Sequence, residues 1–250
     1  MSREQRVALE AYKGLSVVTE AGGAVILTVP VVPGSPMLNR VVGLGVSRPA
    51  TKDDLDDALA SIPPGVTFYV TVAPGARPAD LAAWLAARGL EPGWGWMSFR
   101  RAVTALSPVA TPLRLARVES QEQAAAFARI QCVAYGLPDE LEPVLTEAPL
   151  AGWECWLALD GDEPAGAGAL FVSEGAAYLG FGATLPEQRG KGAQGALLAR
   201  RIARAAELGC DLVVTETGER RGDRPSNSYR NILRAGFEEV AVTANWVGTR

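Results

Sequence analysis

The stretch PEQRGKGAQGALLARRI, residues 186–202, joins a glycine-rich turn to a helix-forming segment without a break. A strand-like run precedes the turn, and apolar residues recur after it at helical spacing. Such a turn presents backbone N–H groups and the positive end of a helix dipole to one point, which is a ready anion site. Arg189 and Lys191 add full positive charges there. We therefore expect an α/β fold in which this turn binds a phosphate group.

Gly190, Gly192 and Gly195 also satisfy the dinucleotide-binding pattern G-x-G-x-x-G, and Glu216 follows about 20 residues later, as that pattern requires. A nicotinamide-dependent oxidoreductase is therefore an alternative, although a less favoured one. In a dinucleotide site the turn follows its strand almost directly, whereas residues 186–189 intervene here. Only about one helix and one strand follow Glu216, too few for a doubly wound sheet. A P-loop is excluded because the Gly-Lys pair is not followed by Ser or Thr.

Strand-like and helix-like segments alternate along the chain, in the same order in its two halves. RVVGLGV (40–46) resembles YLGFGAT (178–184), and AARGL (86–90) resembles LRAGF (233–237). Where the second half has residues 189–192, the first has TKDD (51–54), so only the second copy suits a polyanion. In the first half we expect a helix at 3–12, strands at 24–32, 40–46, 66–72 and 94–102, and helices at 51–62 and 78–88. In the second we expect strands at 113–118, 153–159, 165–172, 176–185, 211–216 and 239–247, and helices at 120–135, 193–208 and 226–235.

The segment TALSPVATP, residues 104–112, is short, rich in proline and made of small residues, which is typical of a linker. We therefore expect two domains in tandem, a degenerate one at 1–108 and a ligand-binding one at 109–250. The first would supply core area to the second or one wall of its substrate cleft.

The amino-acid composition excludes several kinds of catalytic and binding site. The 250 residues include 24 Lys and Arg, 28 Asp and Glu, and no His, for a net charge of −4. The lack of His excludes His-based triads and His-containing metal sites, so we expect no metal. No Lys/Arg block indicates nucleic acid, and no apolar run reaches the roughly 20 residues of a membrane span. The charged start of the chain lacks a secretory signal, so we expect a cytoplasmic protein, with Cys132, Cys155 and Cys210 as reduced, buried thiols.

Two motifs give the chain a resemblance to the GNAT family of N-acetyltransferases over about residues 113–246. Residues 189–194 (RGKGAQ) are similar to the family's phosphate loop, Arg/Gln-x-x-Gly-x-Gly/Ala, except that Gln194 stands where Gly or Ala is usual. Residues 227–237 resemble a second signature, an Asn followed by a helix that ends in Gly-Phe. The resemblance implies a GNAT fold (α/β, or α+β in some schemes), with a mixed, mostly antiparallel central sheet flanked by helices. It also implies acetyl-CoA as cosubstrate.

The resemblance also implies roles for particular residues. The strand before the loop would splay from its neighbour, and free N–H groups near Ala183 and Leu185 would bind the pantetheine arm. The loop would bind the pyrophosphate, and Asn227 would approach the thioester. The implied cofactor-binding residues are Ala183, Thr184, Leu185, Arg189, Gly190, Lys191, Gly192, Ala193, Gln194 and Asn227.

The catalytic groups do not transfer directly, because the family's tyrosine corresponds to Ile232. Acetyl transfer to an amine needs a base and, at most, a proton for the leaving thiolate. We expect Glu216 or Glu174 to act as the base and Tyr229 as the acid. The acceptor would be the amine of a small molecule or peptide, and a homodimer stays open. The missing tyrosine also favours an alternative from another class, a non-catalytic CoA-binding module.

Overall fold

The computed structural model describes residues 1–104, 109–220, 222 and 226–250. The chain forms two compact units that are discontinuous in sequence. The first comprises Met1–Ser2, Ser16–Ser98 and Val240–Arg250, and the second Arg3–Leu15 and Phe99–Glu239. The predicted boundary at residue 108 and the centre of the predicted linker lie outside the described residues, so the division at 108 stays a prediction.

The first unit contains a mixed sheet of order β1-β2-β3-β4-β12, with β5 on β12. Helix α2 begins where the sequence predicts, at a capping box in which the Thr51 hydroxyl accepts from Asp54 N–H (3.1 Å) and the Asp54 carboxylate accepts from Thr51 N–H (2.7 Å). This helix therefore satisfies its own N-terminal donors. Its elements are β1 (Val17–Ala21), β2 (Ala24–Thr28), β3 (Arg40–Val42), α2 (Lys52–Ala60), β4 (Thr67–Val72), α3 (Leu81–Ala87), β5 (Glu91–Pro92) and most of β12 (Glu238–Thr249).

The second unit contains strands in the order β6-β11-β10-β9-β8-β7. Strands β7 to β10 pair antiparallel and β10 pairs parallel with β11, so the sheet is mixed and mostly antiparallel, as expected. Its elements are α1 (Arg3–Lys13), β6 (Trp96–Ala102, shared with the first unit), β7 (Arg114–Arg117), α4 (Gln121–Tyr135), η1 (Asp139–Leu141), α5 (Glu142–Thr146), β8 (Glu154–Asp160), β9 (Glu163–Ser173), β10 (Ala176–Thr184), η2 (Pro186–Gln188), α6 (Ala193–Glu207), β11 (Leu212–Gly218) and α7 (Asn227–Arg234).

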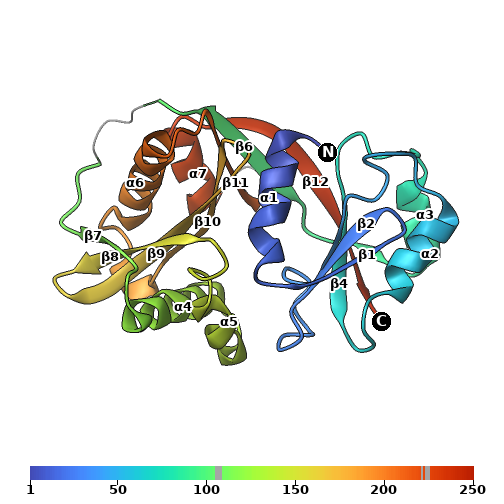
Figure 1. The fold of residues 1–250 in the computed structure, drawn as a ribbon, viewed down its shortest axis with the longest axis horizontal. Helices are drawn as coiled ribbons and strands as arrows, with labels where there is room; N and C mark the ends of the chain where they lie inside the picture. The colour runs from blue at the N-terminus through green and yellow to red at the C-terminus, as the bar shows by residue number, and fades with distance from the viewer. Residues whose placement is uncertain (105–108, 221, 223–225) are drawn as a thin grey trace. The chain divides into compact units, whose positions relative to one another are not determined.

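Helices cover both faces of this sheet. Figure 1 shows α4 and α5 on one side of β8 to β10, and α6 and α7 on the other. Helix α1 packs on the α4 side, where Val7 and Ala11 join a core that includes Phe127 and Trp153. The Trp153 indole N–H donates to the Ala11 carbonyl at 2.8 Å. The predicted first helix is therefore an integral part of the second unit, which local sequence patterns could not reveal.

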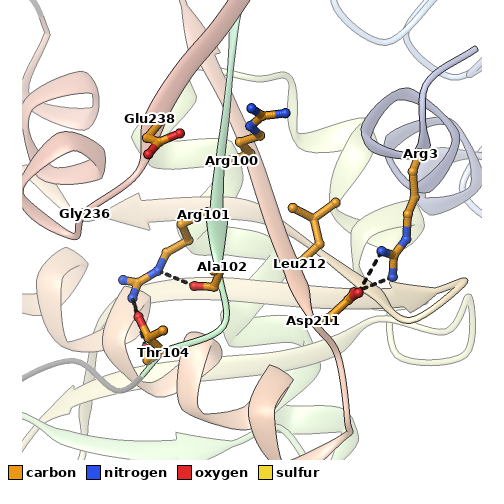
Figure 2. Close-up of a pocket in the computed structure, with 9 residues that line it drawn as sticks. All are labelled: Arg3, Arg100, Arg101, Ala102, Thr104, Asp211, Leu212, Gly236 and Glu238. Carbon is orange, nitrogen blue, oxygen red and sulfur yellow. Dashed lines mark hydrogen bonds and ion pairs between the residues drawn. The ribbon is translucent and has the colours of Figure 1, made fainter.

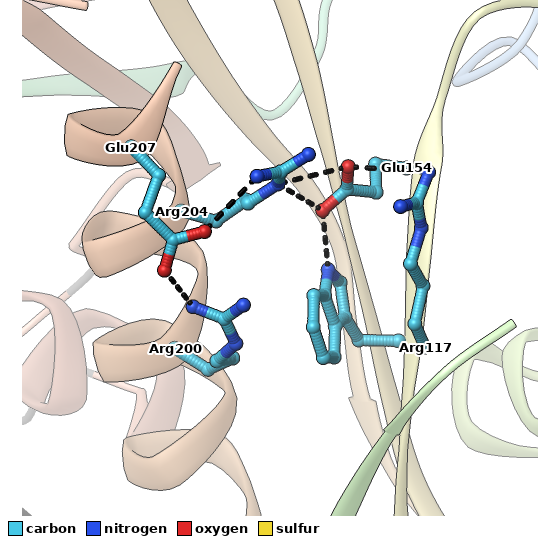
Figure 3. A network of polar contacts seen from close by, with 6 residues as sticks. Arg117, Glu154, Arg200, Arg204 and Glu207 are labelled. Carbon is cyan, nitrogen blue, oxygen red and sulfur yellow. Dashed lines mark hydrogen bonds and ion pairs between the residues drawn. The ribbon is translucent and has the colours of Figure 1, made fainter. Parts of the chain in front are cut away.

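A charged network holds the exposed side of α6 against the strands. The Arg204 guanidinium lies 3.0 Å from the Glu154 carboxylate on β8, and Arg200 lies 2.8 Å from Glu207 (Figure 3). Arg200 also stacks over the Trp156 ring, at 4.5 Å from its centroid. These contacts fix α6, and with it the turn that precedes it.

No helix in the described part of the chain is long and apolar enough to cross a membrane.

Candidate functional site

The glycine-rich turn leaves the N-terminus of α6 without a side-chain cap. Gly190 and Gly192 have φ of +87° and +83°, a left-handed backbone that favours glycine. Gly192 occupies the N-cap position and has no side chain to accept from the first-turn N–H groups. In contrast to α2, these donors remain available to an anion.

The two cations of the turn differ in their surroundings. Lys191 Nζ lies 2.5 Å from the carboxylate of Asp160, the last residue of β8, and 2.7 Å from the Gln188 side-chain oxygen. Arg189 is exposed, and no described residue offers it a hydrogen bond or ion pair. Lys191 therefore ties the turn to the sheet, and Arg189 is the cation left to meet a ligand.

Gln194 links two helices. Its side-chain oxygen accepts from Asn231 Nδ2 at 2.7 Å, and its Nε2 donates to the Ser228 hydroxyl at 3.3 Å. A glycine or alanine could make neither bond, so the departure from the family's pattern has a local reason: it joins α6 to α7.

Strands β10 and β11 part beside this turn. Their parallel pairing runs only as far as Leu179 opposite Thr215, although β10 continues to Thr184 and β11 to Gly218. The register of β10 also shifts between Gly180 and Ala183, where Phe181 has φ of +55°. The splay that the family resemblance implies is therefore present.

Side chains of α4 hold the bulge of β10 in place. Gln131 Nε2 donates to the Phe181 carbonyl at 2.9 Å, and the Tyr135 hydroxyl donates to the Gly182 carbonyl at 2.8 Å. The sequence analysis missed both residues; the signal was two polar groups four apart on one face of a helix. Because a trans peptide points its C=O and N–H in opposite directions, the Gly182 N–H points away from α4.

The donors farther along β10 alternate in direction. Leu185 N–H donates to the Ala165 carbonyl at 3.0 Å, so the expectation that it is free is wrong. Since successive N–H groups of a strand alternate, the Thr184 N–H points to the other side, where β11 has separated. The Thr184 N–H is therefore directed into the gap between the strands, whereas the Gly182 N–H, within the bulge, points to the face of the sheet opposite α4.

Glu216 lies beside the start of this gap, one residue past the last paired position of β11. The Tyr178 hydroxyl donates to its carboxylate at 3.4 Å, and the Tyr12 hydroxyl lies 3.3 Å from that of Tyr178. The three groups form a chain of polar atoms among aromatic rings, with the ring centroids of Trp153 and Phe181 only 4.7 Å apart. Glu216 therefore lies at the start of the gap between β10 and β11.

Glu174 lies beyond the other end of β10, a strand about 26 Å long at 3.3 Å per residue. It occupies the turn before the strand, with φ of +51°. Its carboxylate lies 2.8 Å from Arg6 of α1, and the hydrogen bond from Arg6 lowers its pKa. The structure does not bring Glu174 together with the loop. Instead, Glu174 attaches α1 to the sheet through its ion pair with Arg6.

Tyr229 belongs to the core. It is 1% exposed, its ring packs edge-on against Phe99 at 4.9 Å, and its hydroxyl donates to the Glu239 carboxylate at 2.6 Å. Burial, together with the hydrogen bond to Glu239, raises the pKa of Tyr229 to about 12. Asn227, at the start of the same helix, is exposed and accepts a hydrogen bond from Arg230.

A cavity of about 510 Å³ lies elsewhere in the second unit, at the start of β11 (Figure 2). Its polar groups already have partners: Arg3 pairs with Asp211 at 2.5 Å, and Arg101 donates to Thr104. The parallel pairing of β10 and β11 places it at the opposite end of these strands from the loop. Its lining residues are Arg3, Arg100, Arg101, Ala102, Thr104, Asp211, Leu212, Gly236 and Glu238.

Comparison with known proteins finds a family match within the unit that carries the gap and the loop. Residues 123–224 match the model of the acetyltransferase (GNAT) family. This segment is a GNAT acetyltransferase domain. No curated protein sequence gives a significant match to the chain.

Solved structures share the fold of the chain. A GCN5-related N-acetyltransferase from Kribbella flavida aligns with a TM-score of 0.69 and 21% identity, over 100% of this chain and 96% of its own. One from Sphaerobacter thermophilus aligns with a TM-score of 0.60 and 15% identity, over 79% of this chain and 64% of its own. A tandem GNAT protein from the clavulanic acid biosynthesis pathway, solved without acetyl-CoA, aligns with a TM-score of 0.60 and 15% identity, over 91% of this chain and 78% of its own. At these identities the likeness shows the fold, with the expected GNAT sheet and helices.

The described part of the chain contains no group of three His, Cys, Asp or Glu side chains that could hold a metal ion.

Proposed function

We propose that the protein transfers an acetyl group from acetyl-CoA to a primary amine of a small molecule or a peptide. The observation that carries this proposal is that two sets of donors adjoin each other. The uncapped N-terminus of α6 and Arg189 suit a pyrophosphate, and beside them the Thr184 N–H points into the gap between β10 and β11 while the Gly182 N–H points away from α4. A phosphorylated, amide-containing chain such as CoA fits that arrangement.

Each residue has a separate task in this proposal. The turn at residues 189–194 binds the pyrophosphate, Thr184 bonds the pantetheine arm, and Gly182 N–H donates to the thioester carbonyl, where negative charge develops. Glu216 accepts the proton from the attacking amine. Ala183 and Leu185 shape the strand, and Asn227 lies at the start of α7 beside the cofactor.

The proposal is tested by calorimetric titration with acetyl-CoA, followed by an assay for free thiol over a panel of amines. Binding of acetyl-CoA with thiol release that depends on the amine supports it. Binding of NADH or NADPH without binding of CoA would contradict it and support an oxidoreductase.

A second function, a non-catalytic CoA-binding module, is favoured by a specific observation. Ile232 is 3% exposed at the position of the family's tyrosine, and the nearby Tyr229 is engaged with Glu239 in the core. Binding of acetyl-CoA with no turnover over small amines, amino acids and peptide N-termini would support this second function.

A further inference from the structure

Arg201 differs from the other arginines in the middle of α6. Arg200 and Arg204 are half-buried and pair with carboxylates (Figure 3). Arg201 is 2% exposed, and no carboxylate pairs with it among the described residues. It donates only to backbone carbonyls, from Nε to Leu197 at 3.0 Å and from Nη1 to Ala169 at 3.0 Å and Gly180 at 2.9 Å.

The third nitrogen of the guanidinium, Nη2, has no hydrogen-bond acceptor in the described part of the chain. It lies beside the bulge of β10: a Cβ built on Gly182 would be 3.7 Å from it and 3.8 Å from Gln194 Nε2. The Gly182 N–H, directed away from α4, points to this same face. The Arg201 guanidinium, the Gly182 N–H and the Gln194 amide, one hydrogen of which is bonded to Ser228, therefore converge where no described residue supplies a negative group.

The Arg201 guanidinium fits against β9 because residue 168 is a glycine. A Cβ on Gly168 would come within 2.7 Å of the Arg201 guanidinium carbon. Burying a charge without a counter-charge costs several kcal/mol, so such an arrangement is expected where a ligand supplies the charge. Burial lowers the pKa of Arg201 to about 10, so the guanidinium stays protonated at neutral pH.

We propose that Nη2 of Arg201 stabilises the thiolate that leaves acetyl-CoA, in place of a general acid. This inference rests on the proposed function. The amine nitrogen bonds to the thioester carbon, the C–S bond breaks, and its electron pair remains on sulfur. The amine proton passes to Glu216. With Ile232 at the usual acid position and Tyr229 in the core, a fixed positive charge lets the sulfur leave without a proton.

The test needs no acceptor amine. A positive charge beside the bound sulfur lowers the pKa of the CoA thiol, so CoA should bind more tightly as pH rises through the thiol's range. If the pKa of the CoA thiol is lowered by one unit on binding, the affinity for CoA should rise roughly tenfold between pH 6.5 and 9.5. Desulfo-CoA, which lacks the sulfur but keeps the phosphates, should show no such gain. Both affinities are measured by titration calorimetry on the full chain.

Substitutions assign the effect to one residue. In Arg201→Met the pH-dependent gain for CoA should fall below about twofold, while Arg201→Lys, which keeps a charge, should retain part of it. Arg200→Met is the matched control and should behave like the unsubstituted chain. Circular dichroism and affinity for desulfo-CoA report whether each variant keeps its fold.

The outcomes separate the two levels of proposal. If the unsubstituted chain binds CoA and desulfo-CoA with the same pH dependence, the role of Arg201 is overturned and the proposed function stands; this holds even if Arg201→Met fails to fold. An Arg201→Met variant that retains the full gain also overturns it. If neither ligand binds, the proposed function itself fails, and the inference with it.

Discussion

At the scale of single residues, the sequence predicts what depends on local backbone and misses what depends on distant partners. Gly190 and Gly192 could be assigned because a turn with positive φ at a helix start favours glycine. The partner of Lys191 could not, because Asp160 is 31 residues away. For the same reason Arg201, whose contacts lie on β9 and β10, reads in the sequence only as a charge on a helix.

Arg189→Ala should weaken the binding of acetyl-CoA by roughly ten- to hundredfold, because it removes a charge-assisted hydrogen bond of about 1.5 to 3 kcal/mol. The measurement is titration calorimetry at fixed ionic strength. Lys191→Ala is the control: its Nζ is occupied by Asp160, so its loss should have a smaller effect. Equal affinities for Arg189→Ala and the unsubstituted chain would remove the loop from the site.

Glu216→Gln should lower turnover and alter the pH–rate profile while acetyl-CoA still binds, because a base acts on the amine and not on the cofactor. Steady-state kinetics from pH 6 to 9 check this. Glu174→Gln serves as the comparison, since Glu174 lies at the far end of β10 and should leave the profile unchanged. Should Glu174→Gln alter the profile and Glu216→Gln leave it intact, the assignment would be reversed.

At the scale of elements, periodicity and capping signals located most helices and strands, including α2 with its capping box and α6 after its glycines. Their spatial order was beyond such signals. Strand β6 lies next to β11, and α1 packs against Trp153, because both arrangements depend on contacts between residues far apart in the chain. The bulge of β10 likewise depends on Gln131 and Tyr135 of another element.

The attachment of α1 should weaken in acid. Arg3 pairs with Asp211 and Arg6 with Glu174, and these hydrogen bonds lower the pKa of both carboxyls in the folded state. A lowered pKa means that the stabilisation is complete above the ordinary carboxyl range and is lost as pH falls below about 4. The protection of α1 amides against hydrogen exchange, relative to their intrinsic rates at each pH, should therefore fall below about pH 4, before that of α6. Uniform protection of α1 and α6 down to global unfolding would contradict this.

At the scale of the whole molecule, the sequence indicates a tandem arrangement. The structure shows two units, each built from stretches that are not continuous in the sequence. Residues 3–15 and 99–104 precede the predicted boundary but belong to the second unit. The internal similarity of the two halves could suggest a repeat, but it could not indicate that a helix from the start of the chain completes the core of the second unit.

Deletion of residues 1–108 should therefore give a poorly soluble or partly unfolded fragment. It removes Val7, Ala11 and Phe99 from the core of the second unit and exposes the apolar surface they cover. Size-exclusion chromatography and circular dichroism measure this. A soluble, monomeric fragment that binds acetyl-CoA but lacks turnover would make the first half a substrate-binding wall. Full activity would contradict both roles of the first half.

The discontinuity of the units also governs how the protein is made. Ala11 and its partner Trp153 are separated by 142 positions, so at synthesis rates of about 5–20 residues per second α1 leaves the ribosome many seconds before its docking surface exists. The first unit waits still longer, because it needs β12 at Val240–Arg250. The second unit can be completed once Glu239 is synthesised, and the first only after Val240–Arg250. The apolar face of α1 therefore stays uncovered while the intervening residues are synthesised.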